Sequence, residues 1–262
     1  PMRASNPFRS ILLLWLLPLA AGAADSDPHS QMHSHAHGAQ HGGATVAHLH
    51  APPEFYDLVA ALRRGGYVIF MRHGRTAITE TDAPGVDYAN CSAQRNLSPG
   101  GVLASREMGE ALSALGIPVG RVAASPYCRT MATAREAFGR VHADTDLLAS
   151  PDIAVQAGRK LLEKLAVPPE PGTNTFLVGH VFNALPALGV MLEEGESAVT
   201  FVDHAGKLRL AGRVPQLRWG DLARDVRNYG EAVFPMAAAM RLRHTGTPVG
   251  GDAAPQRPSA HH

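Results

Sequence analysis

The sequence is poor in three features, each of which would define a class of protein. Only two of its 262 residues are cysteine, so the chain is not a disulfide-rich scaffold. Its formal net charge is only +1, which gives no general attraction for nucleic acid or for an anionic membrane. The apolar run at residues 11–20 is well short of the roughly 20 residues that span a bilayer, so no stable membrane anchor is expected. The hydrophobic share, 45%, is ordinary for a globular protein.

The N-terminal segment has the organisation of a secretory signal. Arg3 and Arg9 precede the apolar run, and an Ala-Gly-Ala sequence at residues 21–23 follows it. A basic region, a short apolar core and an A-x-A site are typical of a cleaved signal peptide. We therefore expect residues 1–23 to be removed and the mature protein to be periplasmic or secreted.

Residues 24–53 form a low-complexity segment that is rich in histidine. It contains too few apolar side chains to offset the entropy of ordering the chain, so we expect a disordered linker. Closely spaced imidazoles can share a transition-metal ion; weak metal binding and a solvated tail with no specific role are both open interpretations. The histidines are His29, His33, His35, His37, His41, His48 and His50.

Beyond this segment, predicted strands alternate with predicted helices. Strands are expected at 67–71, 122–125, 141–148 and 175–178, and helices at 54–64, 98–115, 131–138, 153–165 and 181–192. The buried side of the second helix is expected to contain Leu103, Met108, Ala111, Leu112 and Leu115. A hairpin at 197–211 and a helix at 217–226 complete a domain at 54–227, followed by a largely disordered tail at 228–262. This alternation predicts an α/β fold of three layers, with a mostly parallel central sheet and helices on both faces.

Charged and imidazole side chains follow three of these strands. Arg72 and His73 come directly after the first strand, Arg129 lies at the start of the helix after the second, and His180 follows the strand at 175–178. The carboxyl ends of parallel strands meet at one edge of the sheet, where ligands bind, so we expect the four side chains to share a pocket. Two guanidinium groups suit a cluster of anionic oxygens, and a histidine beside them can act as a nucleophile towards phosphorus.

Three motifs, in this order, resemble those of the histidine phosphatase (phosphoglycerate mutase-like) superfamily: MRHGRT (71–76), SPYCRTMATA (125–134) and FLVGH (176–180). A fourth, CSAQRNLSPGG (91–101), resembles the exported bacterial branch in particular. The resemblance extends over about residues 55–219. It implies a phosphoglycerate mutase-like fold and an enzyme that hydrolyses small phosphomonoesters through a phosphohistidine, with no metal or other cofactor required.

The resemblance also implies roles for individual residues. His73 matches the nucleophile, and Arg72, Arg129 and His180 match the positions that hold the phosphoryl group. Their task would be to neutralise oxygens whose charge is redistributed in the transition state. Further candidates for substrate contact, with a solvated or salt-bridged loop position as the alternative, are Arg75, Thr76 and Arg95.

The general acid departs from the family pattern. Many members carry a glutamate shortly after the strand that follows the second-arginine helix, where this chain has DTDLLASPD (144–152). Some members have no dedicated acid, so that alternative stays open. The missing glutamate and the expected export both argue against mutase activity. The candidate acids are Asp82, Asp146, Asp152 and Glu196.

Two other functions remain open. The chain is either a phosphatase of small esters, a phosphohistidine protein phosphatase, or a non-catalytic His-rich metal-binding protein whose phosphatase-like domain only holds anions. The resemblance points to sugar phosphates or lipopolysaccharide-core phosphates as substrates, and the sequence does not determine the oligomeric state.

The two cysteines also leave an alternative open. Cys91 lies in the long polar loop that should cover the pocket, and Cys128 is next to Arg129. A disulfide that pins this loop is expected in an oxidising compartment; two buried free thiols are the alternative.

Overall fold

The structure is a computed structural model that describes residues 49–245 of the chain. The expected signal peptide at 1–23 and nearly all of the His-rich segment lie outside these residues. Within the described part, no helix is both long enough and apolar enough to cross a membrane.

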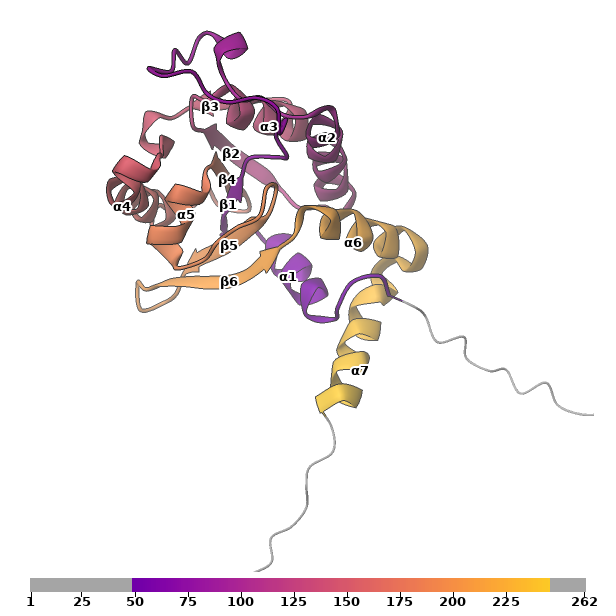
Figure 1. Cartoon of the computed structure of the whole chain (residues 1–262). Helices are drawn as coiled ribbons and strands as arrows, with labels where there is room; N and C mark the ends of the chain where they lie inside the picture. Colours follow the sequence, from indigo (N-terminus) through magenta and orange to yellow (C-terminus); the bar gives the residue numbers. More distant parts are fainter. Residues whose placement is uncertain (1–48, 246–262) are drawn as a thin grey trace, which may run out of the picture. The chain divides into compact units, whose positions relative to one another are not determined.

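Six strands form a single mixed sheet in the order β3-β2-β4-β1-β5-β6 (Figure 1). Strands β1 to β4 run parallel, and the predicted hairpin, β5 and β6, is attached antiparallel to β1. The third strand is much shorter than predicted, because the Asp144 side chain accepts a hydrogen bond from Asp146 N (3.1 Å) and turns the chain into a 3-10 helix. The strands are β1 Val68–Arg72, β2 Val119–Ala124, β3 His142–Ala143, β4 Asn174–Gly179, β5 Ser197–Val202 and β6 Leu208–Val214.

Helices connect the strands as the sequence predicts, and Ser98 caps α2, since Gly101 N donates to its hydroxyl (3.0 Å). Two local features differ from the prediction. Leu103, predicted to be buried in this helix, is 53% exposed, because it lies off the face that packs on α3 and α6. Helix α5 ends earlier than predicted, at Gly189, whose φ of 68° ends the helix. The helices are α1 Glu54–Leu62, α2 Pro99–Ala114, α3 Cys128–Phe138, α4 Ala154–Leu165, α5 Val181–Leu188, α6 Gln216–Tyr229 and α7 Val233–Thr245.

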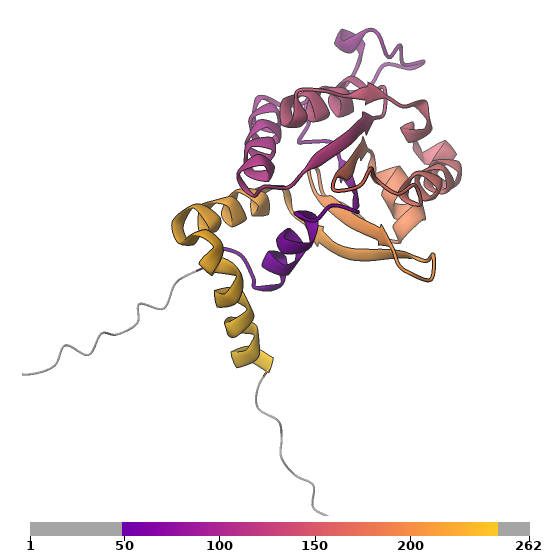
Figure 2. The same ribbon diagram turned by 180° about the vertical axis from the view of Figure 1, so that it is seen from behind.

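The alternation of side chains along β1 explains why the sheet is covered on both faces. Ile69 and Met71 point into a core that includes side chains of α1, α2, α6 and α7. Val68 and Phe70 point the other way, into a core shared with α4 and α5. Figures 1 and 2 show α4 and α5 on one side of the sheet and α1, α2 and α6 on the other. This arrangement confirms the predicted three-layer α/β class.

The ordered region extends beyond residue 227, where the sequence predicts a largely disordered tail. A 3-10 helix at Gly230–Ala232 leads into α7, and both Val233 and Ala237 are fully buried in the core. The guanidinium of Arg63, the residue directly after α1, lies 4.7 Å from the centre of the Phe234 ring and forms an ion pair with Glu231 (2.9 Å). Few apolar positions of α7 are buried, so its sequence carries little helical periodicity.

A matched pair of substitutions tests whether α7 is part of the domain. Ala237→Asp places an unpaired carboxylate in the core and should lower the free energy of unfolding by about 3 kcal/mol or more. Ala239→Asp, on the exposed side of the same helix, should change it by less than about 0.5 kcal/mol. Urea unfolding of both variants measures the difference, and equal stabilities would show that α7 does not pack on the domain.

Candidate active site

Strand register brings the predicted residues together at the carboxyl edge of the sheet. Arg72 of β1 pairs with Gly179 of β4, so the next residues, His73 and His180, lie at the same level. His73 N donates to Gly179 O (3.0 Å), and the two imidazole rings are 5.6 Å apart between centres. Both side chains are only 3% exposed.

Two arginines, the buried Arg129 and the partly buried Arg72, flank these imidazoles. Arg72 Nη1 donates to Leu192 O (2.9 Å), and Arg129, in the first turn of α3, has its guanidinium 4.2 Å from the centre of the Tyr127 ring. Within the described residues, the buried Nε atoms of Arg72 and Arg129 have no hydrogen-bond partner. Buried donors are rarely left unpaired, so two guanidinium groups retain free capacity for an anion.

The hydrogen bonding of His73 leaves one of its ring nitrogens free. Its Nδ1 lies 2.9 Å from Gly74 O; a carbonyl can only accept, so Nδ1 carries the proton and Nε2 keeps its lone pair. Burial lowers the pKa of His73 to about 3, with Arg129, Arg72 and Arg95 adding to the effect and the hydrogen bond to Gly74 opposing it. The imidazole is therefore neutral at pH 7.

His180 is neutral for the same reason. Burial, followed by the charge of Arg129, holds its pKa well below the usual value. Its Nε2 shares a hydrogen bond with Ser125 Oγ (2.9 Å), and its backbone N donates to Asn183 Oδ1 (2.8 Å). Ser125, at the end of β2, is a site residue that the sequence analysis did not identify.

The loop after His73 is held between α3 and α2. Gly74 N donates to Thr133 Oγ1 of α3 (2.9 Å). A Cβ atom at position 74 would lie 2.8 Å from Ser105 Oγ, which is too close for a side chain. A side chain at position 74 would therefore displace the Ser105 hydroxyl from its bond to Gly101 O, so glycine favours the close approach of α2 to the loop.

The three residues expected to contact the substrate lie in different environments. Arg95 lies beside Arg129, whose Nη1 donates to its carbonyl oxygen (3.5 Å), and its charge helps to lower the pKa of both imidazoles, so it borders the pocket. Thr76 instead binds Glu194, through its backbone N (3.2 Å) and its hydroxyl (2.9 Å). The Arg75 side chain is exposed and lines a neighbouring hollow with Glu194 and Leu217.

The structure separates the candidate acids. Asp82 pairs with Arg129 (3.0 Å) and accepts from Arg95 N (2.9 Å), so its carboxylate borders the pocket. The other three lie in different environments: Asp146 pairs with Lys160 (2.7 Å) and Lys164 (3.0 Å), Glu196 pairs with Arg213 (2.8 Å), and Asp152 lies in an exposed turn.

A carboxylate that the sequence analysis missed, Glu194, also borders the pocket. Its Oε1 is 3.6 Å from Arg72 Nη2 and 4.0 Å from His73 Nδ1. It reaches this place because β5 pairs antiparallel with β1, with Ser197 opposite Met71, so the chain just before β5 passes Arg72. The hairpin was predictable from its alternation, but its pairing partner was not.

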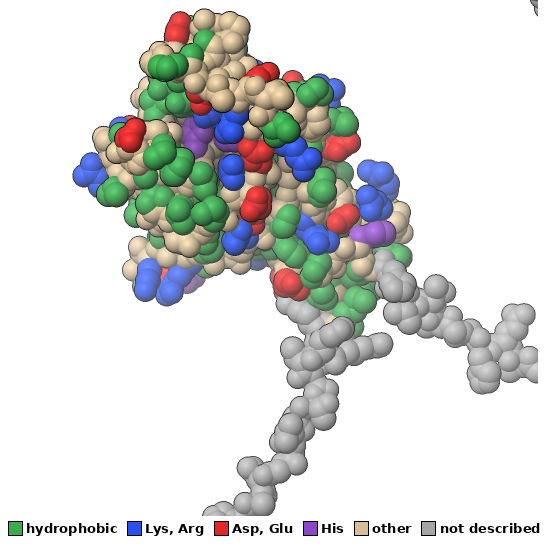
Figure 3. All heavy atoms as spheres, viewed as in Figure 1, with side chains coloured by type: hydrophobic (Ala, Val, Ile, Leu, Met, Phe, Trp, Pro, Cys, Tyr) green, Lys and Arg blue, Asp and Glu red, His purple; other side chains and the backbone are tan. Residues whose placement is uncertain are grey.

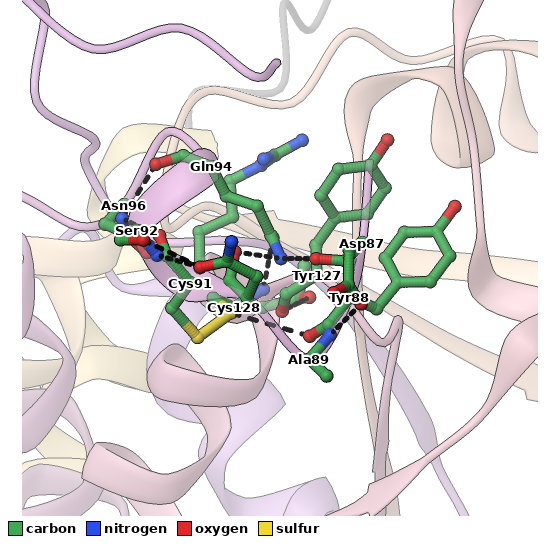
Figure 4. The surroundings of a disulfide bond; sticks show 12 residues. Asp87, Tyr88, Ala89, Cys91, Ser92, Gln94, Asn96, Tyr127 and Cys128 are labelled. Atoms are coloured by element: carbon green, nitrogen blue, oxygen red, sulfur yellow. Dashed lines mark hydrogen bonds between the residues drawn. A yellow bond between two sulfur atoms is a disulfide. The ribbon is translucent and has the colours of Figure 1, made fainter. Parts of the chain in front are cut away.

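Cys91 and Cys128 form a disulfide, with Cα atoms 5.6 Å apart. Gln94 adds a second link between these segments, since its Oε1 accepts from Cys128 N (2.9 Å), and its Nε2 donates to Asp87 O within the loop itself (3.0 Å) (Figure 4). The loop between β1 and α2 is thereby pinned to the start of α3. Figure 3 shows basic and histidine side chains gathered beneath this loop. The expectation that the loop covers the pocket is consistent with these contacts.

No group of three or more His, Cys, Asp and Glu side chains in the described part of the chain is arranged to hold a metal ion. His50, the member of the His-rich set within the described residues, instead bonds to the buried Asp225. Metal binding by the remaining histidines concerns residues outside the described ones.

Comparison with known proteins gives only distant similarities. The sequence matches no protein-family model and no curated protein sequence. Solved structures similar to this chain include the protein histidine phosphatase SixA complexed with tungstate (19% identity, 57% of this chain and 97% of that one, TM-score 0.41). Others are a phosphoserine phosphatase from Entamoeba histolytica (14%, 57% and 96%, TM-score 0.43) and YhfR from Bacillus stearothermophilus (13%, 58% and 98%, TM-score 0.41). Similarity at this level does not determine the reaction, which depends on the side chains of the site.

The low pKa of His73 predicts a pH-dependent loss of stability. Between pH 6.5 and pH 3 the unfolded imidazole binds a proton and the folded one does not, so the free energy of unfolding falls as the pH is lowered. His73→Asn should reduce the fall between pH 7.5 and pH 4.5 by about 2–3 kcal/mol. Denaturant unfolding of the parent and the variant at both pH values measures this change. The difference between the two proteins at pH 7.5 gives the packing effect of the substitution. An unchanged fall would show that the folded imidazole is protonated.

Removal of the disulfide should measurably lower the stability of the folded protein. It closes a loop of 37 residues, so Cys91→Ser should lower the free energy of unfolding by roughly 3–4 kcal/mol. A reducing agent should destabilise the parent protein to a similar extent and leave Cys91→Ser unaffected. Thiol titration of the denatured, unreduced parent should find no free thiol, and two free thiols per chain would contradict the bond.

Proposed function

We propose that the protein is a phosphatase that hydrolyses small phosphomonoesters through a phosphohistidine on His73. One observation carries this proposal: a neutral imidazole with its Nε2 lone pair free is buried beside two guanidinium groups whose Nε atoms have no hydrogen-bond partner among the described residues. An anionic oxygen cluster would satisfy both donors and place its central atom near the nucleophile.

Each residue of the site has its own task in the proposed reaction. Arg72, Arg129 and Arg95 neutralise the phosphoryl oxygens, and neutral His180 orients them by a hydrogen bond. His73 Nε2 attacks phosphorus as the ester P–O bond breaks, which gives a phosphohistidine and a leaving alkoxide that takes a proton from water to become the alcohol. Water then attacks phosphorus, the P–N bond breaks, and phosphate leaves. Each step redistributes charge among oxygens that the arginines already face.

The environment of the carboxylates favours substrates with a good leaving group. Asp82 and Glu194, the two that border the pocket, each face an arginine, so neither carboxyl group is free to approach a leaving-group oxygen as its proton donor. A phosphohistidine in another protein leaves as an imidazole and places little demand on an acid. A phosphohistidine protein phosphatase is therefore the second candidate function.

The proposal also includes a location outside the cytoplasm and a reaction without a metal or other cofactor. The disulfide supports the location, because such bonds persist in oxidising compartments, and it agrees with the signal peptide expected at 1–23. The basic pocket supports the second part, because its cations can provide the charge neutralisation that a metal ion would otherwise supply.

Replacement of the nucleophile tests the mechanism. His73→Ala should abolish hydrolysis of an aryl phosphate measured in the presence of a chelator, because no other group can form the intermediate. His204→Ala, which removes an exposed histidine on the β5–β6 hairpin, should keep full activity. The parent, quenched during turnover, should carry an acid-labile, base-stable phosphoryl group that the His73→Ala protein does not. Substantial activity of His73→Ala would refute the mechanism; activity lost with chelator and restored by metal would refute metal independence.

A further inference from the structure

Two tyrosines extend the pocket towards the surface. The Tyr127 ring meets the His180 ring edge to face, with 4.9 Å between centres, and its face is covered by the Arg129 guanidinium. Tyr88, from the covering loop, meets Tyr127 in the same manner at 5.1 Å. A continuous series of rings therefore leads from His180 outward to Tyr88, whose side chain is 39% exposed.

Contacts of the neighbouring residues fix the position of Tyr88 in the loop. The preceding residue, Asp87, accepts from Ala89 N through its side chain (2.9 Å) and from Gln94 Nε2 through its carbonyl (3.0 Å). The disulfide then joins the loop to Cys128, the residue directly after Tyr127. Figure 4 shows the Tyr88 and Tyr127 rings beside one another. The two segments that carry the rings are thus the two that the disulfide joins.

We propose that Tyr88 and Tyr127 form a binding subsite for the leaving group of the phosphoester, and that this group carries a flat ring. This inference rests on the proposed function. A leaving group attached to phosphorus near His73 has to lie outside the basic pocket, and the tyrosines line the border of that pocket at His180 and Arg129. Aromatic rings attract other rings beyond the simple burial of area, whereas an open-chain alcohol would leave the Tyr88 face in water.

Binding of two non-hydrolysable phosphate analogues tests the subsite without requiring turnover. Phenylphosphonate and methylphosphonate present the same anion to the arginines and differ only in the ring. Calorimetry on the full chain with its disulfide intact should give a Kd for phenylphosphonate roughly three- to tenfold lower than for methylphosphonate. Tyr88→Ala should bring this ratio close to one, and Tyr88→Phe should keep it, because the ring and not the hydroxyl makes the contact.

The control is Ile78→Ala, which removes a side chain that is 98% exposed on the same loop and should leave the ratio unchanged. A ratio near one in the parent, or equal weakening of both ligands in Tyr88→Ala, would overturn the subsite and show that Tyr88 only packs the loop. Either result combined with normal phosphatase activity would leave the proposed reaction intact. A retained ratio in a protein that forms no phosphohistidine would refute the reaction and leave the subsite standing.

Discussion

The parallel pairing of β1 with β4 is the constraint on which the site depends. Its register places His73 and His180 at the same height on the sheet, and the bond from His73 N to Gly179 O (3.0 Å) extends the ladder one residue into the loop. A slip of one residue would turn Ile69 and Met71 to the opposite core and move His73 away from its neighbour. The packing that fixes the fold therefore also fixes the distance between the two imidazoles.

Burial then determines the charge state of the pocket. Two imidazoles beside arginines, removed from water, cannot keep a second proton, so their pKa values fall. The arginines stay cationic and are balanced by carboxylates at the rim, Asp82 and Glu194. An incoming phosphate shares these cations with the carboxylates. Much of the cost of burying positive charge is offset before the substrate arrives, which preserves the site in its free form.

The sequence predicts those site residues that lie at the carboxyl end of a strand or directly after it. Arg72, His73 and His180 follow apolar runs directly, and the parallel arrangement makes their convergence predictable. Glu194 depends on which strand β5 joins, and Ser125 depends on the alignment of β2 with β4. Both are consequences of tertiary pairing, which leaves no signal within a short window of sequence. The extent of α7 was missed for a related reason: burial of Val233 and Ala237 is enough to hold it but too little to create a pattern.

The covering loop shows how a small core can support a precise site. The segment between β1 and α2 contains few buried apolar side chains, so packing alone would leave it mobile. The disulfide and Gln94 join it to the first turn of α3 instead, and Arg95 and Asp82 are carried by the same loop. The charge around Arg129 therefore depends on the covalent bond between Cys91 and Cys128. Reduction would leave noncovalent contacts, such as the bond from Cys128 N to Gln94 and the Asp82–Arg129 ion pair, to hold Asp82 and Arg95, so a cation and its counter-ion would be positioned less firmly in one step.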